Sequence, residues 1–469
     1  MRFVNARDEG PSLRVIGDTI AAIATPAGEG ALSIVRVSGP SAVAIADECF
    51  SSRKRPSQMP SHTVRYGRVV DRRGRTLDRV LLTVMRGPRT STGEDTVEIS
   101  CHGGRLVSCT VLERVLAAGA RLAEPGEFTR RAFLNGHMDL VQAEGVLEVI
   151  RARTDAGLRA ALRQVEGQVS NEYEALREKL DECRVQMECA IEFAEETTPW
   201  PDERILRHLQ AAAAELESMW DRARAGRRIQ DGARVAIIGR PNVGKSTLFN
   251  QLLGEERVIV TDEPGTTRDV VAEWTAIDGI PVRLLDTAGI RSSDCPVERI
   301  AVERAREQGI RAEIVLLLMD ASRNPDEEDE RTLAECRPER TFVVLNKIDL
   351  GVAEQMETWA EEKAGGGVVE RVSALNRSGI EGLRTRIAQR IARDHLPDAG
   401  LVASLRQIDI LRRALEGLRR SASAMSNGAG IELAASDLRE SLDIFGELAG
   451  TTQPEEILNR IFSEFCIGK

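Results

Sequence analysis

The stretch that decides the fold of the central part of this chain is Gly239-Arg240-Pro241-Asn242-Val243-Gly244-Lys245-Ser246. It matches the pattern G-x-x-x-x-G-K-[ST] and lies in the required context, between an apolar strand at 235–238 and a helical segment at 247–253. The glycines let the backbone wrap around phosphate, while the helix N-terminus supplies N–H donors and a favourable dipole. We expect Lys245 to pair with the β- and γ-phosphates and Ser246 to bind Mg²⁺.

Three further motifs follow in the order of a guanine-nucleotide domain. Asp286-Thr287-Ala288-Gly289 ends a strand and fits the D-x-x-G that senses Mg²⁺ and the γ-phosphate. Asn346-Lys347-Ile348-Asp349 ends another strand, and its aspartate can accept hydrogen bonds from the N1–H and the 2-amino group of guanine, which adenine cannot offer. Ser373-Ala374 is expected to close the base pocket. The sequence therefore predicts GTP binding by Asn242, Val243, Gly244, Lys245, Ser246, Thr247, Thr261, Asp262, Glu263, Pro264, Gly265, Thr266, Thr267, Asp286, Thr287, Ala288, Gly289, Asn346, Lys347, Asp349, Ser373 and Ala374.

These motifs leave the mechanism of hydrolysis open. Ras-type enzymes place a glutamine directly after D-x-x-G to orient the attacking water, whereas this chain has Ile290, which cannot do so. Glu298 could act through a water, but a carboxylate at a helix start is equally well explained by the helix dipole. The segment 265–269 lies where switch I belongs, and a threonine hydroxyl there is expected to complete Mg²⁺ coordination. No arginine finger can be identified, so another cation must neutralise the charge of the transition state.

The remaining sequence predicts a multidomain chain of α+β and α/β parts. Residues 18–136 carry short β-rich runs and one helical stretch, which predicts an α+β domain. Residues 137–231 and 395–469 carry apolar stripes at helical spacing, which one discontinuous helical bundle explains best. Residues 232–394 alternate strands with helices, which predicts an inserted, Ras-like, mainly parallel P-loop domain. The stripes expected to be buried are Leu158, Leu162, Val165 and Val169; Leu176, Leu180, Cys183 and Met187; Leu401, Leu405, Ile408 and Leu415; and Leu438, Leu442 and Phe445.

Composition excludes several classes of protein. No apolar run approaches the ~18 residues of a membrane span, and an aromatic content of 3% disfavours a platform for stacking single-stranded bases. The net charge of −10 excludes a chain-wide basic footprint for nucleic acid. The eight cysteines include no C-x-x-C pair, which favours a reducing compartment. Some loop cations could touch phosphate, although solvated loop charge is the commoner explanation: Arg53, Lys54, Arg55, Arg72, Arg73 and Arg75.

Motifs outside the nucleotide domain form a second set: Asp18–Pro26, Thr92-Gly93-Glu94-Asp95, His102-Gly103-Gly104, Arg121–Asn135 with Pro125-Gly126-Glu127-Phe128-Thr129, and the ending Phe465-Cys466-Ile467-Gly468-Lys469. With these motifs and with a G domain inserted into a helical domain, the sequence resembles the tRNA modification GTPases that act with an FAD-dependent partner on wobble uridines. The resemblance runs from Asp18 to Lys469, nearly the whole chain.

The resemblance implies that the N-terminal domain binds a tetrahydrofolate one-carbon donor and forms a homodimer. Arg36, Glu98 and Lys469 match the family's folate contacts. The family usually has lysine where this chain has His137, which puts that contact in doubt, although a protonated histidine could still meet a folate carboxylate. Cys466 resembles the family's C-terminal cysteine, proposed to matter for the modification chemistry; the alternative is a small buried residue near a helix end.

The resemblance also implies that K⁺ takes the place of an arginine finger. Asn242 matches the potassium ligand of the phosphate-binding loop, with Thr261, Glu263 and Thr266 in the flanking loop, and Mg²⁺ would be held by Ser246 and Thr267. In catalysis, Glu298 aligns with the family's water-orienting glutamate, and Arg291 matches a switch II position.

The leading hypothesis is therefore an enzyme that hydrolyses GTP and supports addition of an aminomethyl or carboxymethylaminomethyl group to carbon 5 of the wobble uridine in certain tRNAs. Its flavoprotein partner, in a heterotetramer, would supply FAD chemistry and much of the RNA surface. The alternative is a regulatory GTPase that binds ribosomes or assembly intermediates. We expect a cytoplasmic protein. Residues 1–17 lack an apolar signal region and are explained by a disordered extension or by an over-called start codon.

Overall fold

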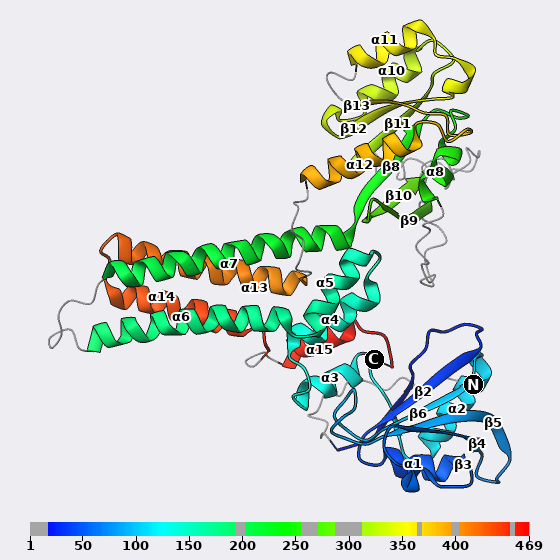
Figure 1. Cartoon of the computed structure of the whole chain (residues 1–469), viewed down its shortest axis with the longest axis vertical. Coiled ribbons are helices and arrows are strands. Elements are labelled where there is room, and N and C mark those ends of the chain that lie inside the picture. Colours follow the sequence, from blue (N-terminus) through cyan, green and yellow to red (C-terminus); the bar gives the residue numbers. More distant parts are fainter. Residues whose placement is uncertain are drawn as a thin grey trace, which may run out of the picture. The chain divides into compact units, whose positions relative to one another are not determined.

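The computed structural model describes residues 17–192, 202–254, 271–286, 312–363, 368–394, 403–450 and 455–468. Two compact units divide the chain, one of residues Met1–Leu147 with Gly446–Lys469 and one of Glu148–Phe445 (Figure 1). The last stretch of the chain, Gly446–Lys469, belongs to the first of these units. Within the described residues, no helix has the length and apolarity needed to cross a membrane.

The first unit is built on a seven-stranded sheet in the order β3-β4-β5-β6-β2-β1-β7. Helices α1 (Ala42–Cys49) and α2 (Arg105–Ala117) contribute to the same buried apolar cluster as one face of this sheet. In β5, Val80, Leu82 and Val84 are buried while Leu81 is 44% exposed, as the two-residue period of a strand requires. The strands are β1 (Ile20–Ile23), β2 (Leu32–Ser38), β3 (Phe50–Ser51), β4 (Thr63–Val70), β5 (Thr76–Met85), β6 (Thr96–His102) and β7 (Arg121–Leu122).

The first unit also contains α3 (Glu127–Leu134), α15 (Glu455–Ser463) and the part of α4 (Leu140–Arg151) up to Leu147. They share an apolar cluster in which the Phe133 and Phe462 rings lie 6.4 Å apart. Beyond α15, Ile467 forms a β-bridge with Pro125. The C-terminal tail is thus fixed to the N-terminal sheet region by backbone pairing and by burial of its phenylalanines.

The second unit contains a bundle of long helices that lie side by side in Figure 1. Two helices of the bundle, α13 (Leu405–Ser426) and α14 (Ile431–Gly446), pack with their backbones close together. Gly417 of α13 allows this approach, because a Cβ on it would lie 3.1 Å from the Ser441 Cβ of α14. The Ser441 hydroxyl donates to the Ala414 carbonyl at 2.7 Å. The helices are α5 (Asp155–Val165), α6 (Gln168–Glu192), α7 (Asp202–Asp231), α13 (Leu405–Ser426) and α14 (Ile431–Gly446).

Two of the predicted stripes are buried and two are partly wrong. Leu176, Leu180, Cys183 and Met187 are buried, as are Leu438, Leu442 and Phe445. Leu158 and Leu162 are 37% and 40% exposed, because α5 buries the face that carries Ala160, Ala161 and Gln164. A turn with Gly167 in a positive-φ conformation separates α5 from α6, so the spacing that links these leucines to Val169 spans two helices. Leu405 is 68% exposed, since it is the first residue of α13. Leu401 lies outside the described residues.

The nucleotide domain has a six-stranded sheet in the order β13-β12-β11-β8-β10-β9. All neighbouring pairs are parallel except β9 and β10, which form an antiparallel edge. The strands are β8 (Ala233–Gly239), β9 (Val271–Ile277), β10 (Ile280–Asp286), β11 (Ile314–Asp320), β12 (Thr341–Asn346) and β13 (Val368–Arg371). The prediction of a doubly wound, mainly parallel sheet is confirmed, and the antiparallel β9 is an addition to it.

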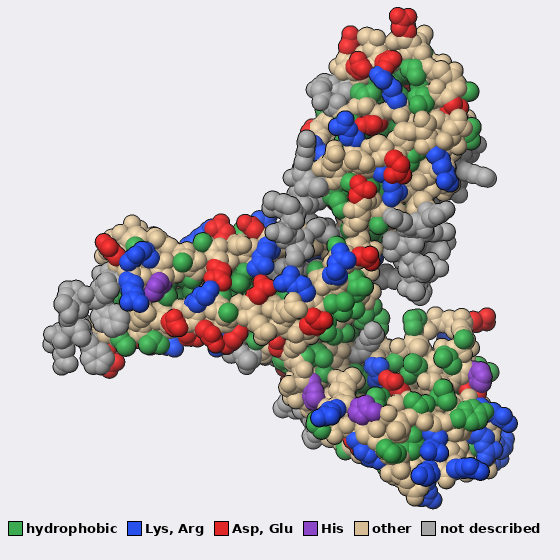
Figure 2. All heavy atoms as spheres, viewed as in Figure 1, with side chains coloured by type: hydrophobic (Ala, Val, Ile, Leu, Met, Phe, Trp, Pro, Cys, Tyr) green, Lys and Arg blue, Asp and Glu red, His purple; other side chains and the backbone are tan. Residues whose placement is uncertain are grey.

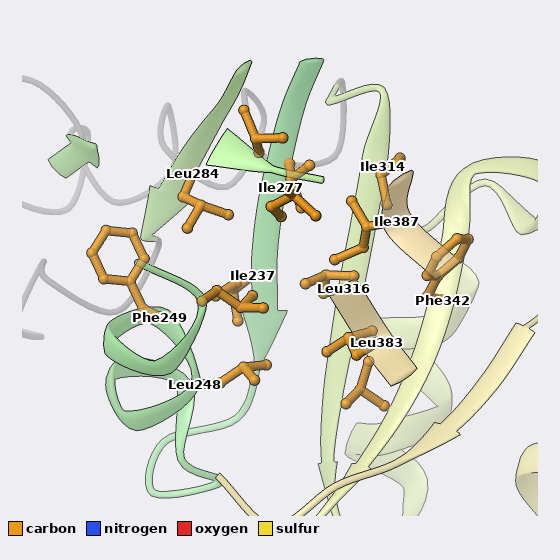
Figure 3. Packing of buried hydrophobic residues seen from close by; sticks show 14 of the residues in the cluster. Ile237, Leu248, Phe249, Ile277, Leu284, Ile314, Leu316, Phe342, Leu383 and Ile387 are labelled. Carbon is orange, nitrogen blue, oxygen red and sulfur yellow. The ribbon is translucent and has the colours of Figure 1, made fainter. Parts of the chain in front are cut away.

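Both faces of this sheet are buried. Successive residues of β11 alternate between two apolar clusters, Leu316 with α8 and α12 on one face and Leu317 with α11 on the other. Figure 3 shows Leu248 and Phe249 of α8 against Ile237 of β8. The helices are α8 (Lys245–Leu253), α10 (Glu327–Ala334), α11 (Glu354–Lys363) and α12 (Ile380–Asp394). This packing fixes the start of α8 at the carboxyl end of β8, where ligands bind in folds of this type.

Candidate functional site

The phosphate-binding loop connects β8 to α8 and is pressed against its neighbours by two glycines. A Cβ on Gly239 would lie 2.3 Å from the Leu318 carbonyl oxygen, so the loop can leave the sheet this closely only at glycine. Gly244, in the left-handed conformation, precedes the first residue of α8. A Cβ there would lie 2.3 Å from the side-chain nitrogen of Asn346. The motif glycines therefore bring the loop into contact with β11 and with the N-K-x-D segment.

Lys245 is folded back onto the loop. Its Nζ donates to the carbonyl oxygens of Gly239 at 2.7 Å and Arg240 at 2.6 Å. The backbone N–H groups at the start of α8 point toward the same loop, as in any helix whose first donors lack intrahelical partners. These donors and the ammonium group form an anion-binding arrangement. Ser246 and Thr247 follow as the second and third residues of α8.

Asn346 joins three of the predicted motifs. Its side-chain nitrogen donates to the Val243 carbonyl at 2.8 Å, and its side-chain oxygen accepts from the Ala374 N–H at 2.9 Å. The residue is 3% exposed, so both bonds are shielded from water. One buried amide thus connects the phosphate-binding loop, the end of β12 and the Ser373-Ala374 segment.

The expected base pocket has a second link between motifs. The Ser373 hydroxyl donates to a carboxylate oxygen of Asp349 at 2.5 Å, and the Asn376 N–H donates to the same hydroxyl at 3.2 Å. Lys347 has a positive φ and places its Nζ 2.7 Å from a carboxylate oxygen of Asp320. Burial raises the pKa of Asp320, but hydrogen bonds from Lys347 and Ser322 outweigh burial and hold the pKa below its ordinary value.

The residues present fit hard cations. Ser246 and Asn242 offer hydroxyl and amide oxygens beside the phosphate-binding loop, and oxygen ligands are what Mg²⁺ and K⁺ accept. Asn242 has a positive φ, which asparagine tolerates better than most residues. Across the described part of the chain, no group of three or more His, Cys, Asp or Glu side chains is arranged to hold a metal.

Several predicted site residues cannot be placed. Asp286 ends β10 beside Ile237 of β8, and its backbone alone is described. The others lie outside the described residues: Thr261, Asp262, Glu263, Pro264, Gly265, Thr266, Thr267, Thr287, Ala288, Gly289, Arg291, Glu298 and Lys469. Most of the switch segments, and with them most of the expected metal and catalytic ligands, therefore stay predictions.

The first unit brings together part of the predicted folate site. Arg36 of β2 and Glu98 of β6 are paired in register, and their side chains form an ion pair of 2.9 Å. The Arg36 guanidinium lies 5.7 Å from the centre of the Phe128 ring, and a second nitrogen donates to the Gly468 carbonyl at 3.4 Å. The carbonyl of Gly468 in the C-terminal tail therefore lies beside Arg36.

His137 and Cys466 lie near other parts of the same unit. His137 packs against the Thr92–Asp95 loop, where a Cβ on Gly93 would lie 2.5 Å from the imidazole ring. Cys466 is exposed, which contradicts the alternative of a small buried residue near a helix end. Its carbonyl accepts from the Gly126 N–H at 3.5 Å, so the cysteine side chain stands in a tail whose backbone is held.

Sequence reasoning missed a cluster of charges in the first unit, which we name the charged cluster: Asp18, Glu94, Arg121, Glu127 and Arg131. Arg131 is bonded to Asp18 at 2.6 Å and to Glu127 at 3.0 Å. Burial raises the pKa of Glu127, but hydrogen bonds from Arg121 and Arg131 outweigh it and leave the pKa lowered. The signal was present, because all five residues belong to motifs that carry the family resemblance.

Comparison with known proteins agrees with this architecture. The family model described as the MnmE helical domain matches residues 140–466, and the one described as the GTP-binding protein TrmE N-terminus matches residues 19–137. The tRNA modification GTPase MnmE of Symbiobacterium thermophilum is 45% identical over 456 residues, which are 96% of this chain and 99% of that protein.

Another similar protein is the MnmE of Geobacillus kaustophilus, 43% identical over 463 residues, with 96% of this chain and 99% of that protein covered. Among solved structures, Era of Aquifex aeolicus bound to GDP and aluminium fluoride is 27% identical, with 39% of this chain and 66% of its own covered at a TM-score of 0.28. The matches to these family models, together with identities of 45% and 43% over nearly the full length of two relatives, show that this chain belongs to the family of MnmE tRNA modification GTPases.

Proposed function

We propose that this chain is a K⁺-activated GTPase that acts with an FAD-dependent partner on certain tRNAs. The pair adds a carboxymethylaminomethyl or aminomethyl group to carbon 5 of the wobble uridine, with a one-carbon unit from a tetrahydrofolate derivative. The observation that carries the proposal is the buried Asn346, which ties the phosphate-binding loop to the base-pocket segment. The family membership supplies the tRNA reaction.

Binding of GTP follows from the residues described. Lys245 exchanges the Gly239 and Arg240 carbonyls for phosphate oxygens, which carry far more negative charge. The Ser373 hydroxyl holds one carboxylate oxygen of Asp349, and the carboxylate accepts from guanine N1–H and the 2-amino group. Adenine has an unprotonated N1 and only a C–H at carbon 2, so it offers the carboxylate neither of these donors and is rejected.

Hydrolysis then needs a positioned water and positive charge near the phosphates. Glu298 orients the water and Arg291 contributes from switch II. Mg²⁺ held by Ser246 and Thr267, and K⁺ held by Asn242, Thr261, Glu263 and Thr266, would supply the charge that an arginine finger supplies elsewhere.

The folate derivative occupies the first unit, with Arg36, Glu98, His137 and Lys469 as its contacts. The Arg36–Glu98 ion pair beside Gly468 supports this assignment, because Arg36 is held and its guanidinium can receive a carboxylate of the ligand. Cys466, exposed in the same tail, serves the modification chemistry.

The assembly is a homodimer formed through the N-terminal domain, joined by the flavoprotein in a heterotetramer, and it works in the cytoplasm. Its domains are residues 18–136, residues 137–231 with 395–469, and the G domain 232–394, after an N-terminal extension of 1–17.

Mass spectrometry of tRNA nucleosides from a deletion strain tests the proposed function. We expect the modified wobble uridine to disappear and to return when the gene is restored on a plasmid. An unchanged nucleoside profile would refute the tRNA reaction and favour a regulatory GTPase that binds ribosomes.

The potassium assignment has its own measurement. GTP turnover by the purified chain should rise strongly when K⁺ replaces Na⁺ at equal ionic strength, because K⁺ stands where an arginine finger would. Equal rates in the two salts would remove Asn242 from the cation site.

A further inference from the structure

One side of the first unit carries an unbalanced positive charge. Residues 50–89, which run from β3 to the loop after β5, contain eleven Lys or Arg and two Asp, a net charge of +9 in a chain of net charge −10. Figure 2 shows Lys and Arg side chains gathered over the part of this unit that holds β3, β4 and β5. The acidic average of the chain therefore hides a strongly basic surface.

Six exposed cations define what we name the basic edge: Arg53, Lys54, Arg55, Arg68, Arg73 and Arg79. Within the described residues, none of the six forms an ion pair with a carboxylate. The two aspartates of the segment have other ionic partners, since Asp71 pairs with Arg75 at 2.7 Å and Asp78 lies 2.7 Å from the His102 ring nitrogen. They contact the basic edge through its backbone, where Asp71 accepts from the Arg73 N–H at 2.9 Å and Asp78 accepts from the Arg79 N–H at 2.7 Å.

Two of these arginines face each other across the sheet. Arg68 of β4 and Arg79 of β5 are directly opposite in register, and both are exposed on the face that α1 and α2 leave open. Like charges at such positions destabilise a strand pair, because the Cβ atoms are only about 5 Å apart. A bound anion between the two guanidinium groups would remove this repulsion.

Protection of a sheet edge explains only part of the pattern. Charges on edge strands keep sheets from pairing with other chains, and β3 with the following Arg53–Arg55 stands at such an edge. Arg68 and Arg79, however, belong to β4 and β5, which are paired on both sides. Their exposed face does not need edge protection, so a ligand explains them better.

We propose that the basic edge binds the phosphodiester backbone of tRNA. This inference rests on the proposed function, which supplies the RNA, and it adds the surface of this chain that touches it. The charges lie along β4, β5 and the flanking loops. Each phosphate of a nucleic-acid backbone has two free oxygens, and one guanidinium group can donate a hydrogen bond to both of them. The contact is ionic and independent of base sequence, so it positions the tRNA without selecting it. This is compatible with a tRNA that is bound by this chain and its flavoprotein partner together.

The experiment is a salt titration of RNA binding by the full-length chain. Fluorescein-labelled bulk tRNA is titrated with the parent and with an Arg68→Ala/Arg79→Ala variant between about 50 and 200 mM KCl, with fluorescence anisotropy as the readout. Each phosphate contact contributes about 0.7 to 0.9 to the slope of log K against log salt, so loss of two contacts should remove roughly 1.4 to 1.8 from that slope. Its affinity at the lowest salt should fall roughly tenfold or more.

The matched control is Arg331→Ala/Arg412→Ala, which removes the same charge from exposed arginines of the second unit that already pair with carboxylates. This control should keep the parental slope. The proposal is overturned if the parent fails to bind tRNA at the lowest salt, or if the variant and the control have the same slope.

A second copy of the chain is the other occupant that this face could accept, because Val64, Tyr66 and Leu81 are also exposed on it. Sedimentation velocity of the same variant decides the matter: an altered oligomeric state with an unchanged salt slope would assign the surface to self-association and overturn the RNA proposal. The nucleoside profile of the deletion strain stays a separate test, so the RNA surface can fail while the proposed function stands.

Discussion

The charged cluster of the first unit and the Asn346 contacts of the nucleotide domain both link distant segments of the chain, the first by ionic hydrogen bonds and the second by neutral ones. Each joins segments that are far apart in sequence through polar side chains that are buried or partly buried. The charged cluster connects Asp18 to Arg121 and Arg131 with ionic hydrogen bonds. Asn346 connects Val243 to Ala374 with a neutral amide.

The difference follows from what each region does. Breaking a buried ion pair is strongly destabilising, so the charged cluster suits a junction whose segments stay together. A nucleotide site must exchange its partners as phosphates arrive and leave. A neutral amide fixes the loop there without adding a charge that would compete for Lys245 or repel phosphate.

The largest expected effect is on the charged cluster. Glu127→Gln leaves Arg131, whose side chain is 7% exposed, with an incomplete set of anionic partners. We expect a loss of about 3 to 5 kcal/mol in the stability of the first unit. Scanning calorimetry is the suitable measurement. The tryptophans of the chain all lie outside the first unit, so tryptophan fluorescence would not report the unfolding of that unit.

The control for this variant is Glu113→Gln, an exposed carboxylate of α2. An equal stability of the two variants would show that the charged cluster contributes no more than an ordinary surface charge.

The next effect is on the neutral contacts. Asn346→Ala leaves the Val243 carbonyl and the Ala374 N–H without this partner, at a cost of about 1 to 3 kcal/mol for each buried group. GTP affinity, measured by titration calorimetry, should fall together with the stability of the nucleotide domain. Asn376→Ala, with an exposed side chain in the same segment, should leave both unchanged.

A smaller change is expected in base selectivity. Asp349→Asn turns one acceptor oxygen into a donor, so the pocket should prefer XTP and lose about 2 kcal/mol, or roughly 30-fold, in GTP affinity. Competition between the two nucleotides measures the preference. Asp278→Asn, in the exposed turn between β9 and β10, is the control. Unaltered selectivity for GTP would remove Asp349 from the base pocket.

The smallest expected effect is a difference between the two regions in how their contribution to stability depends on pH. Burial raises the pKa values of Asp18 and Glu127, but the arginine hydrogen bonds outweigh it and lower both pKa values in the folded state. Their stabilisation is therefore present above the unfolded pKa values near 4 and is lost as the pH falls through the folded ones. Asn346 does not titrate.

The stability gap between the parent and Glu127→Gln should accordingly narrow as the pH is lowered below about 4, while the gap between the parent and Asn346→Ala should stay constant. A gap for Glu127→Gln that is independent of pH would contradict the ionic description of the charged cluster.

The sequence by itself determined the nucleotide domain, because its motifs combine glycines and polar residues at spacings that only strand ends and a helix start can use. The strand–helix alternation of residues 232–394 likewise predicted the doubly wound sheet, since local periodicity sets which faces are apolar. Local patterns failed at Leu158, Leu162 and Leu405, because α5 buries another face and Leu405 is the first residue of α13.

Only the tertiary structure decided which distant residues meet. The pairing of Asp18 with Arg131, the position of Gly468 beside Arg36 and the opposition of Arg68 and Arg79 depend on strand order and register, which no local pattern specifies. The net charge of −10 is a sum over the whole chain, whereas binding depends on how charges are distributed over a surface. Folding places Arg68 and Arg79 opposite each other on one face of one sheet, and that arrangement is what composition could not reveal.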